Sequence, residues 1–297
     1  MALSLSTTLQ AVYSMLGELN ISKVTSGTTT TIVDSTIANT SRDNVWKEGT
    51  AFMVYDIGGA GATPEGQFQR ISAFTNSTGT FTVDTAFTTA PAANDLYGVA
   101  SSYYPLRQMI RAVNDSLADL GDIDLMDTTT LDTVVGQTEY SASVTWKRAR
   151  PYRVDIQVIT GDATDNQWQQ WHNWDWIPAN AGTAGKIIFT AYQTGSRDIR
   201  VWYKGIHPQL NEYSDVVWEG FDPELVKKAA LVKALEWQNS RTQGADQFLT
   251  QKLNAATQSL ENRKVTNPVW HPRRKPRYMI AGRAVDNYDD FTWPAAV

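Results

Sequence analysis

The pair of amphipathic runs between Asp222 and Lys264 constrains this chain most, because it is the longest uninterrupted helical signal in the sequence. Asp222, Pro223 and Glu224 are typical of a helix start: a capping carboxylate, a proline whose missing N–H is not needed there, and an acid near the positive end of the helix dipole. Two apolar stripes at helical spacing follow, through Leu225, Ala229, Val232 and Leu235, and through Leu249, Leu253, Ala256 and Leu260. Amphipathic helices joined by a short loop predict a helical hairpin.

Two further stripes precede this hairpin, through Leu9, Val12, Leu16 and Leu19, and through Leu106, Ile110, Val113, Leu117 and Leu120. Runs of β-branched and aromatic residues, separated by Gly, Asn, Ser and Pro, lie between the helical segments. Among them, Asn76-Ser77-Thr78-Gly79 is predicted to form a hairpin turn between two strands. Four one-sided helices are what a four-helix bundle needs. We therefore predict an α+β fold: a four-helix bundle core with two antiparallel β insertions and an extended C-terminal arm. The alternative is a helical hairpin leaning on a mixed sheet.

These patterns divide the chain into six segments. They are a first bundle helix (1–20), an inserted β-domain (21–100), a second bundle helix and loop (101–128), a second β-rich insertion (129–210), the helical hairpin that completes the bundle (211–264), and the C-terminal arm (265–297). Prolines 268, 272, 276 and 294 favour an extended course in the last segment.

Composition excludes several classes of protein. The chain has 297 residues, a net charge of −5 and no cysteine, so disulfides and thiolate metal sites are excluded. No apolar run approaches the roughly 18 residues that span a bilayer, and the N-terminus lacks the pattern of a signal peptide, so we expect no membrane association. Eleven tryptophans among only 19% charged residues suggest either surface that is buried against partners or a β-rich domain with aromatic cores.

No motif for catalysis emerges. His172, His207 and His271 lie in separate contexts, without a second ligand at metal-binding spacing. The glycine-rich run at residues 58–61 lacks the lysine and the following helix of a phosphate-binding loop. We expect no enzyme, no cofactor and no metal site.

A tryptophan cluster allows two interpretations. Trp168, Trp171, Trp174 and Trp176 alternate with Gln, Asn and His residues, and could stack on sugars or bases. Nothing else in the segment supplies a cationic groove or polar pocket. The favoured interpretation is a strand edge whose indoles pack on the sheet or on a neighbouring subunit, with a secondary binding surface as the alternative.

The C-terminal segment is rich in cations and aromatic residues. It carries five of the 26 Lys and Arg residues and three of the 31 Asp and Glu residues, which leaves the tail at +2 and the body at −7. Disordered tails have few large aromatic residues, so we predict an arm that docks on another protein. Its candidate contacts are Trp270, Arg273, Arg274, Lys275, Arg277, Tyr278, Tyr288, Phe291 and Trp293. Salt-sensitive nucleic-acid binding by the basic run is the competing interpretation.

Three segments resemble the head-to-tail connector, or adaptor, proteins of tailed bacteriophages. They are the helix at 106–120, the strand end Tyr203-Lys204-Gly205-Ile206-His207-Pro208, and Leu225-Val226-Lys227-Lys228-Ala229-Ala230. The resemblance implies a structural virion protein without enzymatic activity.

The resemblance also implies partners and a location. Members form a ring, commonly of twelve copies, beneath the portal protein in the neck of the virion. A downstream tail or neck protein follows, and DNA passes through the channel without sequence-specific binding. Residues 265–297 would be the arm that reaches the portal or a neighbour, and assembly would take place in the host cytoplasm. The alternative function is a receptor- or glycan-binding virion protein, which the tryptophans and the two β segments would serve.

Overall fold

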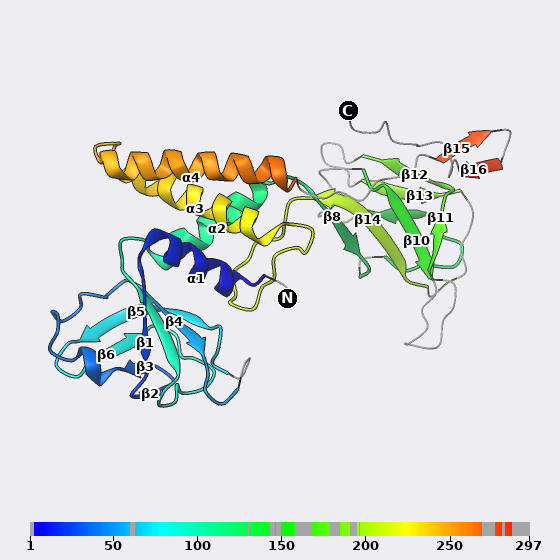
Figure 1. Cartoon of the computed structure of the whole chain (residues 1–297). Helices are drawn as coiled ribbons and strands as arrows, with labels where there is room; N and C mark the ends of the chain where they lie inside the picture. Colours follow the sequence, from blue (N-terminus) through cyan, green and yellow to red (C-terminus); the bar gives the residue numbers. More distant parts are fainter. Residues whose placement is uncertain are drawn as a thin grey trace.

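The computed structural model describes residues 3–59, 63–129, 131–142, 146, 150–157, 168–178, 185–190, 195, 197–268, 277–280 and 283–286, the last two ranges by their backbone alone. The described chain forms three parts (Figure 1). A layer of helices lies over a closed sheet on one side, and two facing sheets extend from it on the other. The helical layer therefore joins the two β parts.

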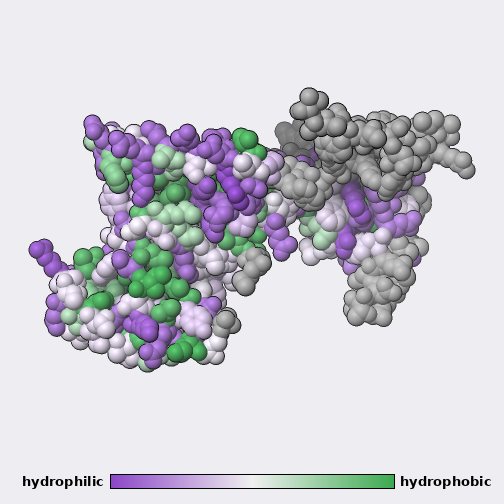
Figure 2. Space-filling model, in the orientation of Figure 1, coloured by the Kyte–Doolittle hydropathy of each residue, from purple (hydrophilic) through white to green (hydrophobic). Residues whose placement is uncertain are grey.

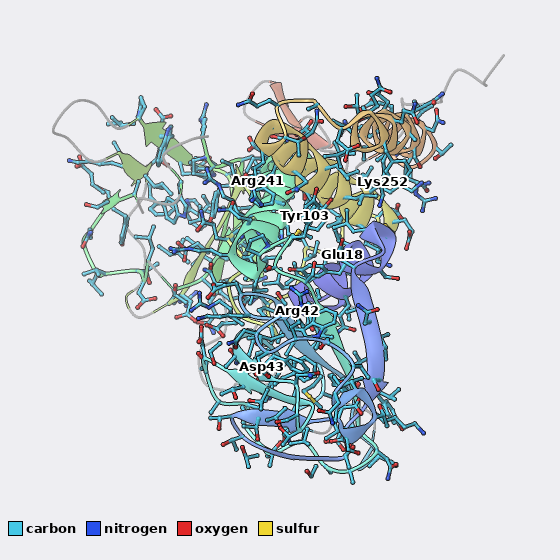
Figure 3. All side chains as sticks on the ribbon, turned by 90° about the vertical axis from the view of Figure 1, so that its left-hand side faces the viewer. Glu18, Arg42, Asp43, Tyr103, Arg241 and Lys252 are labelled. Atoms are coloured by element: carbon cyan, nitrogen blue, oxygen red, sulfur yellow. The ribbon has the colours of Figure 1, made fainter. Side chains whose placement is uncertain are left out.

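The helical layer is assembled from segments far apart in the sequence. Its helices are α1 (Leu5–Leu16), α2 (Leu106–Asp119), α3 (Pro223–Arg241) and α4 (Gln247–Thr266). Helix α1 begins at Leu5: Ser4 caps it in a reciprocal pair with Thr7, and Gly17 ends it at φ 78°. Lys252 of α4, labelled in Figure 3, reaches the end of α1, where its Nζ donates to the Leu16 carbonyl at 2.9 Å.

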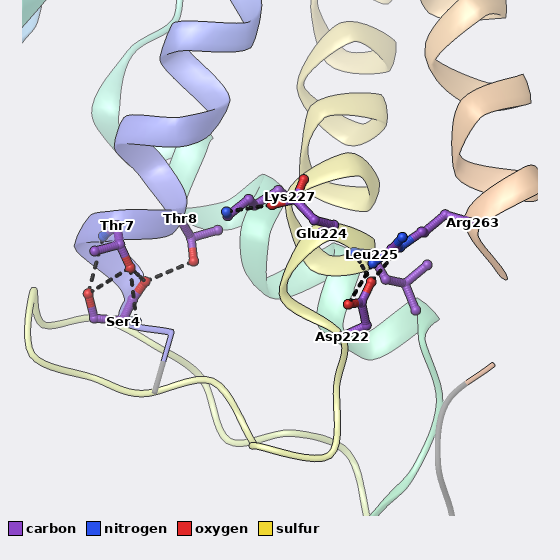
Figure 4. A network of polar contacts seen from close by, with 8 residues as sticks. All are labelled: Ser4, Thr7, Thr8, Asp222, Glu224, Leu225, Lys227 and Arg263. Carbon is purple, nitrogen blue, oxygen red and sulfur yellow. Dashed lines mark hydrogen bonds and ion pairs between the residues drawn. The ribbon is translucent and has the colours of Figure 1, made fainter. Parts of the chain in front are cut away.

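Asp222 fastens the start of α3 to the end of α4 (Figure 4). Its carboxylate accepts from the Leu225 backbone N–H at 3.0 Å, which confirms the predicted cap. The same carboxylate accepts from Arg263 of α4, from Nε at 2.7 Å and from Nη2 at 2.9 Å. One side chain thus caps one helix and holds the other against it, because a guanidinium binds both oxygens of a carboxylate.

The sheet of residues 19–100 closes on itself. Its strands are β1 (Leu19–Lys23), β2 (Ser26–Thr28), β3 (Thr31–Val33), β4 (Thr50–Tyr55), β5 (Phe68–Thr75), β6 (Thr80–Val83) and β7 (Leu96–Ala100), in the order β1-β7-β4-β5-β6-β3-β2. The two edge strands are consecutive, and Val24 and Thr25 between them donate to Asp95 on one side and to Val33 on the other. A single bent segment thus pairs with both ends of the sheet. A separate core that includes Phe74, Phe81 and Tyr97 lies on its inner face.

The predicted turn at residues 76–79 joins β5 to β6 and is confirmed. Gly79 has φ +63°, and a Cβ there would lie 2.0 Å from the Asp34 carbonyl oxygen. Only glycine fits this backbone conformation so close to a neighbouring strand.

Two sheets face each other in the second β part. The four-stranded sheet has the order β11-β10-β14-β8, and the three-stranded sheet has the order β12-β13-β9. Their strands are β8 (Ile123–Asp127), β9 (Glu139–Ser141), β10 (Arg153–Gln157), β11 (Trp168–Trp171), β12 (Trp174–Ile177), β13 (Lys186–Phe189) and β14 (Ile199–Gly205). Ile156 and Val201 of one sheet share a core with Ile187 and Phe189 of the other. Strand β8 lies in a stretch that was predicted to be a loop.

The predicted four-helix bundle core is wrong. Sheet dominates the described chain, with seven, four and three antiparallel strands against four helices. Helices α1 and α2 bury their stripes, and α3 buries Val226, Ala230, Ala234 and Leu235, together with Phe52, Phe68 and Ala100 of the closed sheet. Leu225, Ala229 and Val232 of the predicted α3 stripe instead pack with Leu260 of α4. Among the residues of α4 only Leu249 and Leu260 are buried. The helices form a layer seated on a sheet (Figure 1), because an apolar stripe does not specify what covers it. Figure 2 shows hydrophobic residues gathered where this layer meets the closed sheet.

The structure describes only part of the predicted arm at residues 265–297. Helix α4 continues to Thr266, and β15 (Arg277–Ile280) pairs antiparallel with β16 (Arg283–Asp286). The prolines predicted an extended course for this segment. They did not predict that two parts of it pair as strands.

We expect Asp222→Ala to lower the free energy of unfolding by about 1–2 kcal/mol, since it removes a helix cap and a half-buried ion pair. Asp222→Asn should lose less, because asparagine also caps helices. Hydrogen bonds from Arg263 hold the pKa of Asp222 below its usual value. Its contribution is therefore present above the unfolded pKa of about 4 and is lost as the pH falls through the folded pKa. Urea unfolding at pH 7 and pH 3 measures both effects, and equal losses at the two pH values would contradict this role.

Candidate partner-binding surfaces

One face of the four-stranded sheet carries polar and aromatic side chains. In the register, Trp168 lies opposite Gln157, Asp155 opposite Arg200, and Arg153 opposite Trp202. Residues paired across neighbouring strands project to the same side. These six residues therefore share one face, and the hydrophobic core lies on the other.

Asp155 organises this face from its centre. Its side chain is fully buried, and it accepts from Arg153 Nε at 2.7 Å and from Trp202 Nε1 at 2.8 Å. Both carboxylate oxygens are thus used, as a buried charge requires. The result is a fixed arrangement of side chains across strands β10 and β14.

Two arginines stack on indoles of this face. The Arg200 guanidinium lies 3.9 Å from the ring centroid of Trp168, and Arg153 lies 5.6 Å from that of Trp202. Such cation–π contacts are electrostatically favourable. Trp168 is only half-buried, with the Gln157 and Gln170 amides on the same face. An indole beside amides and a cation can stack with, and hydrogen-bond to, a flat polar ligand.

The four predicted tryptophans do not form one surface. Trp168 lies on the polar face, whereas Trp171, Trp174 and Trp176 pack against the core between the two sheets. Arg150 also lies over Trp174, at 5.6 Å from the ring centroid. Three of the four indoles therefore have a packing role within the chain.

The predicted arm contacts are placed only in part. Arg277 and Tyr278 are the first two residues of β15, where Tyr278 pairs with Val285. Trp270, Arg273, Arg274, Lys275, Tyr288, Phe291 and Trp293 lie outside the described residues.

A groove between α2 and α3 was not predicted from the sequence. It is a hollow of about 500 Å³ lined by Gln108, Arg111, Ala112, Asp115, Lys233, Glu236 and Trp237. Lys233 binds Asp119 at 2.6 Å, and Arg241 stacks on Trp237 at 4.9 Å. Figure 3 looks onto the side of the molecule where Arg241 and Tyr103 lie. The sequence did contain a signal for this groove. Arg111 and Asp115 are four residues apart on the polar side of one helix, and Trp237 and Arg241 are four apart on another, so each pair can interact.

The histidines are placed in separate environments. His207 is buried after β14: its Nδ1 lies 2.6 Å from the Pro208 carbonyl oxygen, and its Nε2 accepts from the Trp218 N–H at 2.9 Å. His172 is exposed between β11 and β12, and His271 lies outside the described residues. Among the described residues no three His, Cys, Asp or Glu side chains are grouped to hold a metal ion.

Comparisons with known proteins provide no family. No protein-family model matches the sequence, and no curated protein matches it. Among the helices in the described part of the chain, none is both long and apolar enough to cross a membrane.

We expect His207→Gln to remove a pH dependence of stability. Burial lowers the pKa of His207 below its usual value of about 6.5. Since the unfolded chain then binds the proton more readily, the wild-type free energy of unfolding should decrease as the pH falls from about 6.5 through the folded pKa. Glutamine can still accept from Trp218, so the variant should lack this decrease. Thermal unfolding between pH 5 and 8 measures it, with His172→Gln as the exposed control that keeps it. A decrease unchanged in His207→Gln would refute the assignment.

Proposed function

We propose that the protein is a structural subunit of the neck of a tailed-bacteriophage virion, which joins the portal to the tail as a ring around the DNA channel. The main support is the architecture: one helical layer, built from three separate stretches of sequence, carries two β parts (Figure 1). A subunit with several rigid faces can contact ring neighbours, the portal and a tail protein at the same time. The three segments that resemble phage connectors lie in α2, at the end of β14 and in α3.

In this proposal the faces have separate roles. Head-to-tail contacts between copies form a closed ring when the rotation from each copy to the next is a whole fraction of a turn. The α2–α3 groove offers an indole, an alanine floor and charges of both signs to such a neighbour. Ion pairs at its rim would favour a specific orientation more than they would add affinity. The role assigned to the protein is structural, without a catalytic step.

Assembly on the portal tests the proposal. The purified chain, mixed with preassembled portal rings, should add a ring of density below the portal in negative-stain images. A chain that remains monomeric beside the portal would refute the proposal. The matched variant ends after Pro268, which keeps all of α4. It should keep its helical circular dichroism signal but fail to join the portal, if the C-terminal segment provides the contact.

A second candidate, glycan binding, is favoured by the polar face of the four-stranded sheet. Trp168 is half-buried there and stacks with Arg200, while the other three clustered tryptophans pack against the core. Half-exposed indoles with neighbouring amides suit the apolar faces and hydroxyls of sugars.

We expect Trp168→Ala to abolish any binding seen on a glycan array, because it removes the stacking surface without opening the core. Trp168→Phe should retain part of the signal. Absence of binding by the wild-type protein, or binding unaffected by Trp168→Ala, would refute this candidate.

A further inference from the structure

Arginines stack on indoles at four places in the described part of the chain, and only one of these arginines lacks a compensating negative group. The pairs are Arg150 with Trp174, Arg153 with Trp202, Arg200 with Trp168, and Arg241 with Trp237. Arg150 lies 3.6 Å from Asp175. Arg241 lies in the last turn of α3, at the negative end of the helix dipole. Arg200 forms no ion pair with any described acid.

The acid opposite Arg200 in the sheet is already occupied. Arg200 of β14 is the register partner of Asp155 of β10, the neighbouring strand (Figure 1). The two oxygens of that carboxylate accept instead from Arg153 at 2.7 Å and from Trp202 at 2.8 Å. The polar face thus contains two arginines stacked on indoles, one with a carboxylate supplied by the chain and one without.

Burial makes the missing negative charge at Arg200 more costly. Its Nε is enclosed by protein and has no hydrogen-bond acceptor among the described residues. The side chain as a whole is only half-buried, so the terminal nitrogens are the donors that a ligand can reach. A partly dehydrated cation gains more from a nearby anion than a cation in water does. Arg200 is therefore suited to bind an anion from outside the chain.

We propose that Arg200 and Trp168 bind an acidic sugar, with its carboxylate on the guanidinium and its ring against the half-exposed indole. The inference rests on the glycan-binding candidate and deepens it by naming the class of glycan. The sugar carboxylate takes the part that Asp155 plays for Arg153, since a guanidinium binds both oxygens of a carboxylate. Gln170 lies on the same face, where its amide can bond to sugar hydroxyls.

The groups around Arg200 favour a sugar over a nucleic acid or an acidic peptide. Binding to a phosphate backbone takes several free cations, but Asp155 already neutralises Arg153 on this face. Peptides are bound largely through main-chain pairing or in a groove. Beside the cation, this face offers an indole and amide side chains, which match the apolar faces and the hydroxyls of a sugar ring.

A glycan array with matched pairs of ligands tests the inference. It presents uronic-acid and sialic-acid glycans beside their carboxyl-reduced forms, in which a neutral alcohol replaces the carboxylate. The wild-type protein should bind an acidic glycan at least about tenfold more tightly than its reduced form. Only the acidic form accepts hydrogen bonds between two charged groups from Arg200.

Variants of Arg200 locate the preference for the carboxylate. R200Q should lose the preference, since glutamine is neutral. R200K should keep part of it, because lysine retains the charge but not the planar stack on the indole. R241Q removes an exposed arginine that stacks on Trp237, and as the control it should leave the preference unchanged. Thermal unfolding shows that each variant is folded, and R200K together with the reduced glycans decides the question should R200Q unfold.

The possible failures are distinguishable. Absence of binding to every glycan would refute the glycan-binding candidate and this inference with it. Equal binding of acidic and reduced forms, or a preference retained in R200Q, would overturn only the assignment of Arg200 to a carboxylate. Binding of a poly-aspartate peptide in place of acidic glycans would identify the partner as an acidic protein segment and overturn the sugar assignment.

Discussion

The junction between the helical layer and the closed sheet depends on one hydrophobic core that the two parts share. Tyr13 of α1 lies fully buried within it, edge-on to Phe52 of β4 with ring centroids 5.5 Å apart. Its hydroxyl donates to the Tyr104 carbonyl at 2.7 Å, where the chain leaves the sheet for α2. Burying each large apolar side chain contributes on the order of 1.5–3 kcal/mol. The residues of this core come from both parts. Without the other part, the apolar faces of the helices and of the sheet would each be exposed to water.

Sequence reasoning worked where the cause is local. The cap at Asp222 and the turn at Gly79 depend on a few neighbouring residues, and both are found as predicted. Helical stripes at Leu106 and Leu225 were also recognisable. The bundle was wrong because Phe52 and Phe68, which precede the stripe at Leu106 by about forty to fifty residues and α3 by more than 150, complete the same core. An apolar stripe predicts burial but not the partner, and the pairing of distant segments has no local signal.

The same limit applies to the candidate binding surfaces. The tryptophan cluster was identified from composition, but residue spacing alone did not show that Trp168 and Trp171 project to opposite faces of β11. Their separation by three positions in a strand, where side chains alternate, decides this once the strand is known. The α2–α3 groove was missed because it arises only when Arg111 and Trp237 meet from helices more than a hundred residues apart.

The closed sheet also has a consequence for how such a chain can change. Leu19 and Ala100 are partners in the pairing of β1 with β7, so the chain enters and leaves the sheet at neighbouring positions. A module whose ends meet can be lengthened, exchanged or deleted with little disturbance to the segments that flank it. Residues 19–100, between α1 and α2, thus form a self-contained module, and a lineage could replace them while retaining the helices that hold the remainder together.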